Sequence, residues 1–359
     1  MAVADWVPIR DDLRSFEPYG APQVDVAVRL NVNENPYGPS VETIADIAAS
    51  VAHAAADLNR YPDREAWALR SALADYLGHG LDASGVWAAN GSNEVMLQIL
   101  QAFGGPGRTA ASFAPTYSMY PEYARDTHTR WVTAPRADDF TVDVDAALEL
   151  IGREQPDVVM LTSPNNPTGT ALPLATVRAI CEAAPGVVVV DEAYGEFRRE
   201  GTASALEVRS DYRTLLVSRT MSKAFAFAGG RLGYVAAAPE VIDALRIVRL
   251  PYHLSSVTQA VALAALRHSG ELLSRVDELR ATRDEVSAWL LEQGHEVARS
   301  DANFVMFGVF EDRHAVWQGL VDRGVLIRET GPDGWLRVSI GTPDEMKCFY
   351  DALQEVLDR

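Results

Sequence analysis

The stretch Gly186–Tyr194, with the sequence GVVVVDEAY, decides the fold class of this chain. Its valines follow one another without polar residues between them, which is typical of a strand buried on both faces. It is one of six short β-rich runs, and helical patterns such as Glu94–Phe103 and Leu174–Ala184 separate them. The runs are Gly85–Ala89, Thr109–Ser112, Val158–Thr162, Val187–Val190, Leu215–Ser218 and Gly233–Ala237. This alternation predicts an α/β fold, in which a large domain has a mainly parallel sheet sandwiched by helices.

The C-terminal part of the chain predicts a second, smaller α/β domain. Apolar residues recur at helical spacing from Glu271 to Gln293. Strands are expected near Asn303–Phe307, Val325–Arg328 and Trp335–Ile340. A length of 359 residues, 48% of them hydrophobic, suits two domains. We expect an N-terminal arm associated with the small domain (1–50), a large domain (51–280) and a small C-terminal domain (281–359).

Composition argues against several classes of protein. The formal net charge of −18 argues against a surface for nucleic acid or for an anionic membrane. No apolar run approaches the about 18 residues that a membrane span requires, and the first residues do not resemble a secretory signal. Two cysteines and seven scattered histidines provide neither a disulfide framework nor a metal site. We therefore expect a cytoplasmic protein without a metal.

Lysine is unusually scarce. Of the 32 basic residues only Lys223 and Lys347 are lysines. A coding bias toward arginine explains most of this, but it makes each lysine informative, because lysine can lose its proton and act as a nucleophile. Lys347 suits a solvated helix face. Lys223 lies in the apolar, glycine-rich stretch TMSKAFAFAGGRLG (220–233), which favours a neutral, reactive amine; a buried salt bridge is the alternative.

Polar clusters follow four of the predicted strands, at the edge where open α/β sheets bind their ligands. Asn90–Glu94 could offer the N–H groups of a helix N-terminus to a phosphate, although, taken alone, an ordinary N-cap accounts for it better. Ser163–Gly169, with two prolines, forms a stiff turn that could hold an asparagine amide in a fixed orientation. A plain turn is the alternative there.

The other two clusters contain ionisable groups. Asp191 ends a fully buried strand, so it needs a partner to stay ionised. A protonated pyridine nitrogen would be suitable, and Tyr194 could reach the same ligand; helix capping by Asp191 is the alternative. The hydroxyl groups of Thr220 and Ser222 and the guanidinium of Arg231 could bind a phosphate near Lys223.

The ordered set GSNE, PTY, SPNNPTG, DEAY, SRTMSKAF with GGRLGY, and LRVSIG resembles the fold-type I, class II aminotransferases over nearly the whole chain. Within that group the chain is similar to the histidinol-phosphate aminotransferases. The segments behind this likeness are EPY (17–19), LNVNENPYGP (30–39), RYPDRE (60–65), WAANGSNE (87–94), DEAYGEF (191–197), RLPYHLSSVTQ (249–259) and SDANFVMF (300–307). One departure is Ser163, where many relatives have asparagine; Asn166 of the same motif is retained.

This resemblance implies pyridoxal 5′-phosphate as the cofactor. Lys223 would form its Schiff base, and Asp191 would pair with the pyridine nitrogen. Asn166 and Tyr194 would contact the ring oxygen, while Tyr117 would stack on the ring. The cofactor phosphate would lie against Gly91, Ser92, Asn93, Thr220, Ser222 and Arg231.

The resemblance also implies a homodimer and a reaction. Tyr61 would reach the phosphate in the neighbouring subunit. Arg337 and Arg328 would form a local anion site for the substrate phosphate in one half-reaction and a glutamate carboxylate in the other. The implied reaction transfers the amino group of L-glutamate to imidazole acetol phosphate, giving L-histidinol phosphate and 2-oxoglutarate in histidine biosynthesis. Candidates for contacting the imidazole-bearing substrate are Tyr19, Asn93 and Tyr252, for which aromatic packing and loop structure are the alternative.

Three other functions compete with this interpretation. An aromatic amino acid (phenylalanine) aminotransferase would share every cofactor residue, and a threonine-phosphate decarboxylase would share the scaffold. A non-catalytic regulator with a cofactor-binding fold would need a nucleic-acid-binding module, for which the chain has no basic patch. A nicotinamide enzyme is disfavoured because GGRLG (229–233) is not a GxGxxG fingerprint.

Overall fold

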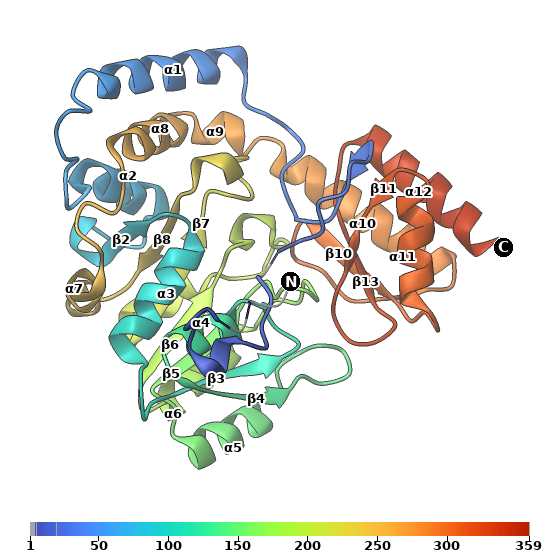
Figure 1. Cartoon of the computed structure of the whole chain (residues 1–359), viewed down its shortest axis with the longest axis horizontal. Helices are drawn as coiled ribbons and strands as arrows, with labels where there is room; N and C mark the ends of the chain where they lie inside the picture. The colour runs from blue at the N-terminus through green and yellow to red at the C-terminus, as the bar shows by residue number, and fades with distance from the viewer. Residues whose placement is uncertain (1–3, 5, 19, 359) are drawn as a thin grey trace.

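The largest element of the computed structural model, which describes residues 4, 6–18 and 20–358, is a seven-stranded sheet (Figure 1). Its strands lie in the order β2-β8-β7-β6-β5-β3-β4, and only β8 runs against the others. They are β2 (Val86–Ala89), β3 (Thr109–Ala114), β4 (Arg130–Pro135), β5 (Val158–Thr162), β6 (Val187–Asp191), β7 (Leu215–Thr220) and β8 (Gly233–Ala236). The mainly parallel sheet is confirmed, with β4 as a strand that the sequence pattern did not predict.

Helices cover both faces of this sheet, so all its strands except the edge strand β4 are buried on both sides. One face packs against α2 (Trp67–Leu77), α5 (Val144–Glu154), α6 (Leu174–Ala183) and α8 (Ser256–Arg267). The opposite face packs against α3 (Ser92–Phe103), α4 (Tyr120–Asp126) and α7 (Pro239–Val248). In β6, Val188 and Val190 join the first layer, and Val187 and Val189 join the second. Alternate side chains of a strand point to opposite faces, which is why an unbroken run of valines suits this position.

A second sheet lies beside the first, and the C-terminal helices pack on it (Figure 1). It is antiparallel, in the order β12-β13-β10-β9. Its strands are β9 (Glu296–Val297), β10 (Phe304–Gly308), β12 (Arg328–Glu329) and β13 (Leu336–Ser339). The accompanying helices are α10 (Val276–Glu292), α11 (Arg313–Val321) and α12 (Pro343–Leu357). A smaller α/β unit at the C-terminus is therefore confirmed.

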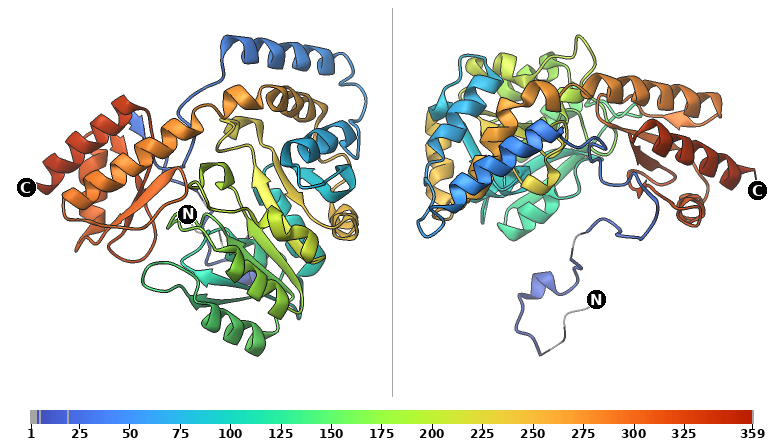
Figure 2. Two further views of the ribbon diagram at one scale, coloured as in Figure 1. Left: turned by 180° about the vertical axis from the view of Figure 1, so that it is seen from behind. Right: turned by 90° about the horizontal axis from the view of Figure 1, so that it is seen from above.

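The N-terminal region contacts both units. The short strand β1 (Val28–Arg29) pairs in parallel with β11 (Val325–Leu326) of the smaller unit. Helix α1 (Val41–Ala55) instead packs along α8 of the larger one. Figure 2 shows the blue N-terminal chain passing from one unit to the other.

Two expected boundaries fall inside helices. Residue 50 lies within α1, and residue 280 lies within α10. The single long helix expected from Glu271 to Gln293 is interrupted, because α9 (Ser269–Leu272) ends before α10 begins. The division into an arm and two domains stays a prediction. Among the described residues, no helix is both long and apolar enough to cross a membrane.

Candidate active site

One cavity of about 260 Å³ collects most of the residues that the sequence singled out. It lies at the carboxyl ends of β5, β6 and β7, where the second sheet and the N-terminal chain approach the large sheet. Its lining includes Ser92, Asn93, Tyr117, Asn166, Asp191, Tyr194, Thr220, Ser222, Lys223, Arg231, Arg328 and Arg337. It also includes Asn31, Val32 and Asn33, which the sequence analysis did not select; we call residues 31–33 the strap.

Lys223 presents its amine to this cavity. Its Nζ donates a hydrogen bond of 2.8 Å to the backbone oxygen of Val32 in the strap. Burial lowers the pKa of Lys223 from 10.5 to about 8, and the nearby charges of Arg337 and Arg231 lower it too, against the opposing effect of Glu34. None of the ion pairs of the described residues includes Lys223. The amine is thus adapted to lose its proton near neutral pH.

Asp191 ends β6 and is 4% exposed. Its Oδ2 accepts a hydrogen bond from the Tyr120 hydroxyl at 2.9 Å, and its Oδ1 accepts one from the Ala193 N–H at 3.1 Å. Burial raises the pKa of Asp191 to about 6, although the bond from Tyr120 acts in the opposite direction. A cationic partner would restore full ionisation. Tyr120 was missed at the sequence level, where its only signal is its position three residues after Tyr117 in PTYSMY.

The helix N-terminus beside the cavity is open to an anion. The N-cap of α3 is Gly91, which has no capping side chain and a φ of 84°. A Cβ at Gly91 would lie 2.5 Å from a terminal nitrogen of Arg231, so a larger residue there would require this guanidinium to move. Opposite it, the Thr220 hydroxyl donates to the Ser222 hydroxyl at 3.0 Å. Backbone N–H groups, hydroxyls and a guanidinium together suit a phosphate.

Two arginines form the side of the cavity that belongs to the second sheet. Arg328 of β12 and Arg337 of β13 are direct partners in the antiparallel register. Arg337 donates to the backbone oxygen of Asn31 at 2.9 Å and makes a short hydrogen bond with Oδ1 of Asn166. One terminal nitrogen of Arg328 is buried and has no hydrogen-bond partner among the described residues. Two adjacent guanidinium groups repel each other unless an anion lies between them.

Two expected residues lie away from this cavity. The rings of Tyr61 and Tyr252 stack at 4.3 Å, and these side chains are 79% and 40% exposed. Neither of them lines the cavity that contains Lys223 of the same chain. Gly91 is buried beside Arg231 and does not line the cavity. The expected contact of Tyr19 lies outside the described residues.

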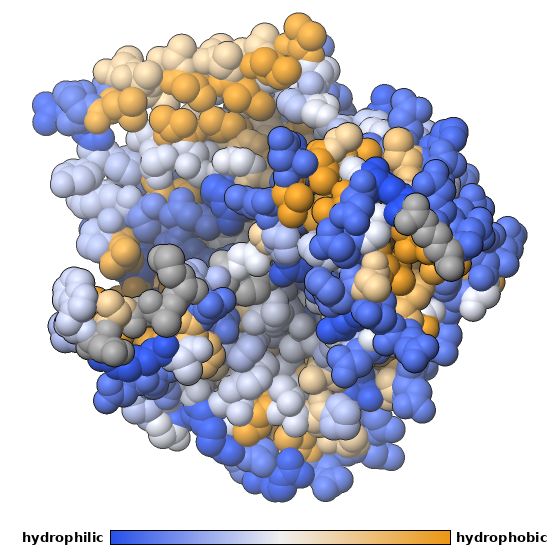
Figure 3. Space-filling model, turned by 45° about the vertical axis from the view of Figure 1, so that its right-hand side comes forward, coloured by the Kyte–Doolittle hydropathy of each residue, from blue (hydrophilic) through white to orange (hydrophobic). Residues whose placement is uncertain are grey.

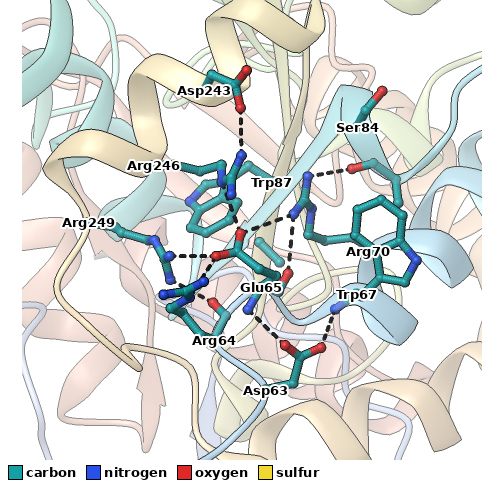
Figure 4. A network of polar contacts seen from close by, with 12 residues as sticks. Asp63, Arg64, Glu65, Trp67, Arg70, Ser84, Trp87, Asp243, Arg246 and Arg249 are labelled. Carbon is teal, nitrogen blue, oxygen red and sulfur yellow. Dashed lines mark hydrogen bonds and ion pairs between the residues drawn. The ribbon is translucent and has the colours of Figure 1, made fainter.

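An ion network holds the loop that follows Tyr61 (Figure 4). The carboxylate of Glu65 contacts Arg249 at 2.8 Å and Arg246 at 2.9 Å, both at the end of α7. It also lies 3.7 Å from Arg70 of α2, whose side chain is 3% exposed. This network fixes the segment carrying Tyr61 against the end of α7 and the chain that leads to Tyr252.

The residues of the cavity fit pyridoxal phosphate. The amine of Lys223 could react with its aldehyde. The buried carboxylate of Asp191, which has no cationic partner among the described residues, could pair with its pyridine nitrogen. The uncapped N-terminus of α3, with the two hydroxyls, could bind its phosphate. The described residues contain no group of three or more histidine, cysteine or acidic residues that could hold a metal ion.

Comparison with known proteins agrees with this geometry. Residues 25–353 match the profile of the family described as aminotransferase class I and II. A histidinol-phosphate aminotransferase of Thermobifida fusca is 66% identical over 97% of this chain and 95% of its own length. Histidinol-phosphate aminotransferase 3 of Burkholderia lata is 60% identical over 99% and 97%. The crystal structure of histidinol-phosphate aminotransferase from Sinorhizobium meliloti in complex with pyridoxal-5′-phosphate has a TM-score of 0.82 at 28% identity, covering 93% of this chain and 91% of that one.

Proposed function

This chain belongs to the class I and II aminotransferases, and we propose that it transfers the amino group of L-glutamate to imidazole acetol phosphate, giving L-histidinol phosphate and 2-oxoglutarate. The observation that carries this proposal is that the amine of Lys223 and the guanidinium pair of Arg328 and Arg337 face one cavity. A substrate with an amino or keto group near one end and a phosphate at the other would engage both. A cytoplasmic location belongs to the same proposal.

Pyridoxal 5′-phosphate would be held by groups from both faces of this cavity. When bound, it supplies an electron sink for the charge left on the substrate carbon when its proton departs. Asp191 would carry a negative charge opposite the pyridine nitrogen, and Tyr117 would pack on the ring. Asn166 and Tyr194 would bind the ring oxygen. The phosphate would lie against Gly91, Ser92, Asn93, Thr220, Ser222 and Arg231.

Lys223 would also move the substrate proton. With its pKa lowered to about 8, the free amine is neutral often enough at neutral pH for Nζ to accept the proton of the substrate Cα. Nζ, which then carries that proton, would deliver it on the same face to the carbon on the other side of the transferred nitrogen. The amino donor and acceptor use the same cavity in turn, so the expected kinetics are ping-pong.

The guanidinium pair would select for an anionic end group. Arg337 and Arg328 together provide several N–H donors for a phosphate or a carboxylate. Phenylalanine has no anion at that end, which argues against it as the preferred substrate. Asn93 and Tyr252 remain proposed contacts of the imidazole ring, Tyr252 from the neighbouring subunit.

The active unit in this proposal is a homodimer. Tyr61 and Tyr252 are stacked on the surface, outside the cavity of their own chain, where residues of one subunit could complete the site of another. Apolar side chains are exposed nearby, and an orange band over α1 in Figure 3 extends this surface. They are Val41, Ile44, Leu58, Trp67, Ile247 and Leu250.

Borohydride trapping tests the cofactor assignment. The loaded protein should absorb visible light, and reduction should fix the cofactor on the peptide that contains Lys223. Lys223→Ala should lose the absorbance, the adduct and turnover, while Lys347→Ala, the other lysine, should keep all three. A colourless wild-type protein without an adduct would refute the assignment. Rates with histidinol phosphate and phenylalanine then test the substrate, and a faster reaction of phenylalanine contradicts our choice.

Mixing two inactive variants tests the shared site. In the proposed dimer each site combines Lys223 of one subunit with Tyr61 of the other. Lys223→Ala and Tyr61→Ala therefore each inactivate the sites by removing a different one of these two residues. A mixed dimer therefore contains one site with both residues intact, and activity should return to about a quarter to a half of wild type after subunit exchange. No recovery in a mixture shown to contain mixed dimers would contradict the contribution of Tyr61 across the interface.

A further inference from the structure

Asn33 of the strap is bonded through its backbone N–H, its backbone carbonyl and both ends of its side-chain amide. It is 2% exposed and has a φ of 58°, a conformation that asparagine tolerates better than most residues. Its N–H donates to the Ser339 hydroxyl at 2.8 Å, and its carbonyl accepts from the Asn303 amide at 3.1 Å. Its side-chain Nδ2 donates to the Tyr194 hydroxyl at 2.9 Å.

Ser339 fixes which end of the Asn33 amide faces Tyr194. The Ser339 hydroxyl accepts from the Asn33 N–H and donates its own proton to Oδ1 of Asn33 at 2.9 Å. Oδ1 therefore faces Ser339, and the NH2 group faces Tyr194. An amide NH2 group only donates hydrogen bonds, so the Tyr194 oxygen must accept from it. The proton of the Tyr194 hydroxyl is then directed away from Asn33.

We propose that Asn33 is a positioning residue, which holds the Tyr194 hydroxyl as a hydrogen-bond donor toward the ring oxygen of the cofactor. Tyr194 lines the cavity, and its ring centroid lies 5.9 Å from Nζ of Lys223. The inference rests on the proposed function, because it needs an acceptor in the cavity. In this proposal Asn33 acts through Tyr194 and not on the reacting atoms themselves.

The direction of this hydrogen bond has a measurable consequence. A hydrogen bond donated to the anionic ring oxygen stabilises the negative charge of that oxygen. It thereby favours the deprotonated form of the Schiff base that Lys223 would make with the cofactor. Loss of that donor should move the pH midpoint of the visible absorbance upward. The other charged groups around Lys223 are Arg337, Arg231 and Glu34, with Asp191 and Arg328 in the same cavity, and the test leaves them unchanged.

The test is an absorbance titration of pyridoxal-phosphate-loaded protein. Asn33→Gly removes the donor without adding charge and suits the positive φ. It should raise the midpoint by about half a unit, and Tyr194→Phe should raise it further. In the double variant the midpoint should equal that of Tyr194→Phe alone, because Asn33 has nothing left to position. An unshifted midpoint in Asn33→Gly, or additive shifts in the double variant, would overturn the proposal.

Two further variants test whether the shift comes from the hydrogen bond between Asn33 and Tyr194. Asn33→Asp keeps the size of the side chain but can accept the Tyr194 proton, so it should raise the midpoint more than Asn33→Gly does. The additional shift caused by Asn33→Asp should be smaller in a protein that already carries Tyr194→Phe. Asn35→Ala is the matched control, since Asn35 lies on the same chain segment and donates to the Ala224 oxygen instead. A midpoint shift in Asn35→Ala as large as in Asn33→Gly would show that the effect comes from a nonspecific disturbance of this chain segment, and it would contradict the proposal. A wild-type protein without titrating absorbance would instead defeat the proposed function.

Discussion

Arg328 and Arg337 lie directly opposite each other on the antiparallel strands β12 and β13, so that two guanidinium groups share one side of the cavity. Like charges at directly paired positions destabilise a sheet. Arg337 is also 6% exposed, which leaves water little chance to screen it. In a chain with a net charge of −18, this pair is a local positive site whose repulsion an anionic ligand would relieve.

Arg328→Met and Arg337→Met should each weaken binding of histidinol phosphate by about 10- to 100-fold, because hydrogen bonds to a charged group are lost. The larger loss is expected for Arg337, which also contacts Asn31 and Asn166. Binding of histidinol, which has no phosphate, should change little. Calorimetric titration of both ligands checks this, with Arg213→Met as the surface control. Equal losses for the two ligands would contradict an anion site.

The pH dependence of cofactor capture should follow Lys223. Its pKa is lowered to about 8 from 10.5, and only the neutral amine reacts with an aldehyde. The rate at which the apoprotein captures pyridoxal phosphate should therefore rise with pH and level off above about 8. Removing a positive charge in Arg337→Met should move this midpoint upward. Stopped-flow absorbance measures it, and a wild-type midpoint near 10.5 would be incompatible with the lowered pKa.

The same shift affects stability. Between about pH 8 and 10.5 the unfolded chain binds a proton at Lys223 that the folded chain does not. Stability rises with pH wherever the unfolded state binds more protons, so Lys223 should make the apoprotein more stable as the pH rises through this window. Lys223→Met should remove that contribution from the pH profile of urea unfolding. If the free energy of unfolding of Lys223→Met changed with pH as steeply as that of the wild type in this window, the contribution of Lys223 would be contradicted.

Tyr120→Phe should weaken cofactor binding by raising the pKa of Asp191 above its present value of about 6. The lost hydrogen bond is one of the groups that oppose the effect of burial. More of Asp191 is then protonated at neutral pH, and its attraction for a protonated pyridine nitrogen falls. We expect an about fivefold higher dissociation constant for pyridoxal phosphate. Tyr212→Phe, whose hydroxyl bonds to Glu182 on the surface, should bind as the wild type does.

Glu65→Gln should destabilise the protein, because Arg70, Arg246 and Arg249 lose the carboxylate between them (Figure 4). The side chain is 20% exposed, so we expect a decrease of about 2 kcal/mol in the free energy of unfolding, below the loss from a fully buried pair. Chemical denaturation measures this. Asp351→Asn, which breaks the exposed pair with Lys347, should change stability by less than about 0.5 kcal/mol. Similar losses in both variants would refute a special role for Glu65.

Much of the large sheet could be predicted because its strands are local patterns. Four uninterrupted apolar residues, as in Val187–Val190, need burial on both faces, and helical segments between the runs require a mainly parallel sheet. Strand β4 was missed because Arg130–Pro135 mixes polar and apolar residues at the sheet edge. The interruption between α9 and α10 was missed since the apolar spacing continues across it.

The sequence by itself determined which residue types carry the chemistry: one lysine in an apolar stretch, and a carboxylate, amides and hydroxyls at strand ends. These follow from local composition and from the rule that parallel strands present their carboxyl ends at one edge. Only the tertiary structure decided their partners. Tyr120 meets Asp191 across 71 residues, and Asn33 meets Tyr194 across 161. Such contacts depend on how separate elements pack, and hydrogen bonds between distant residues leave no periodic signal in the chain.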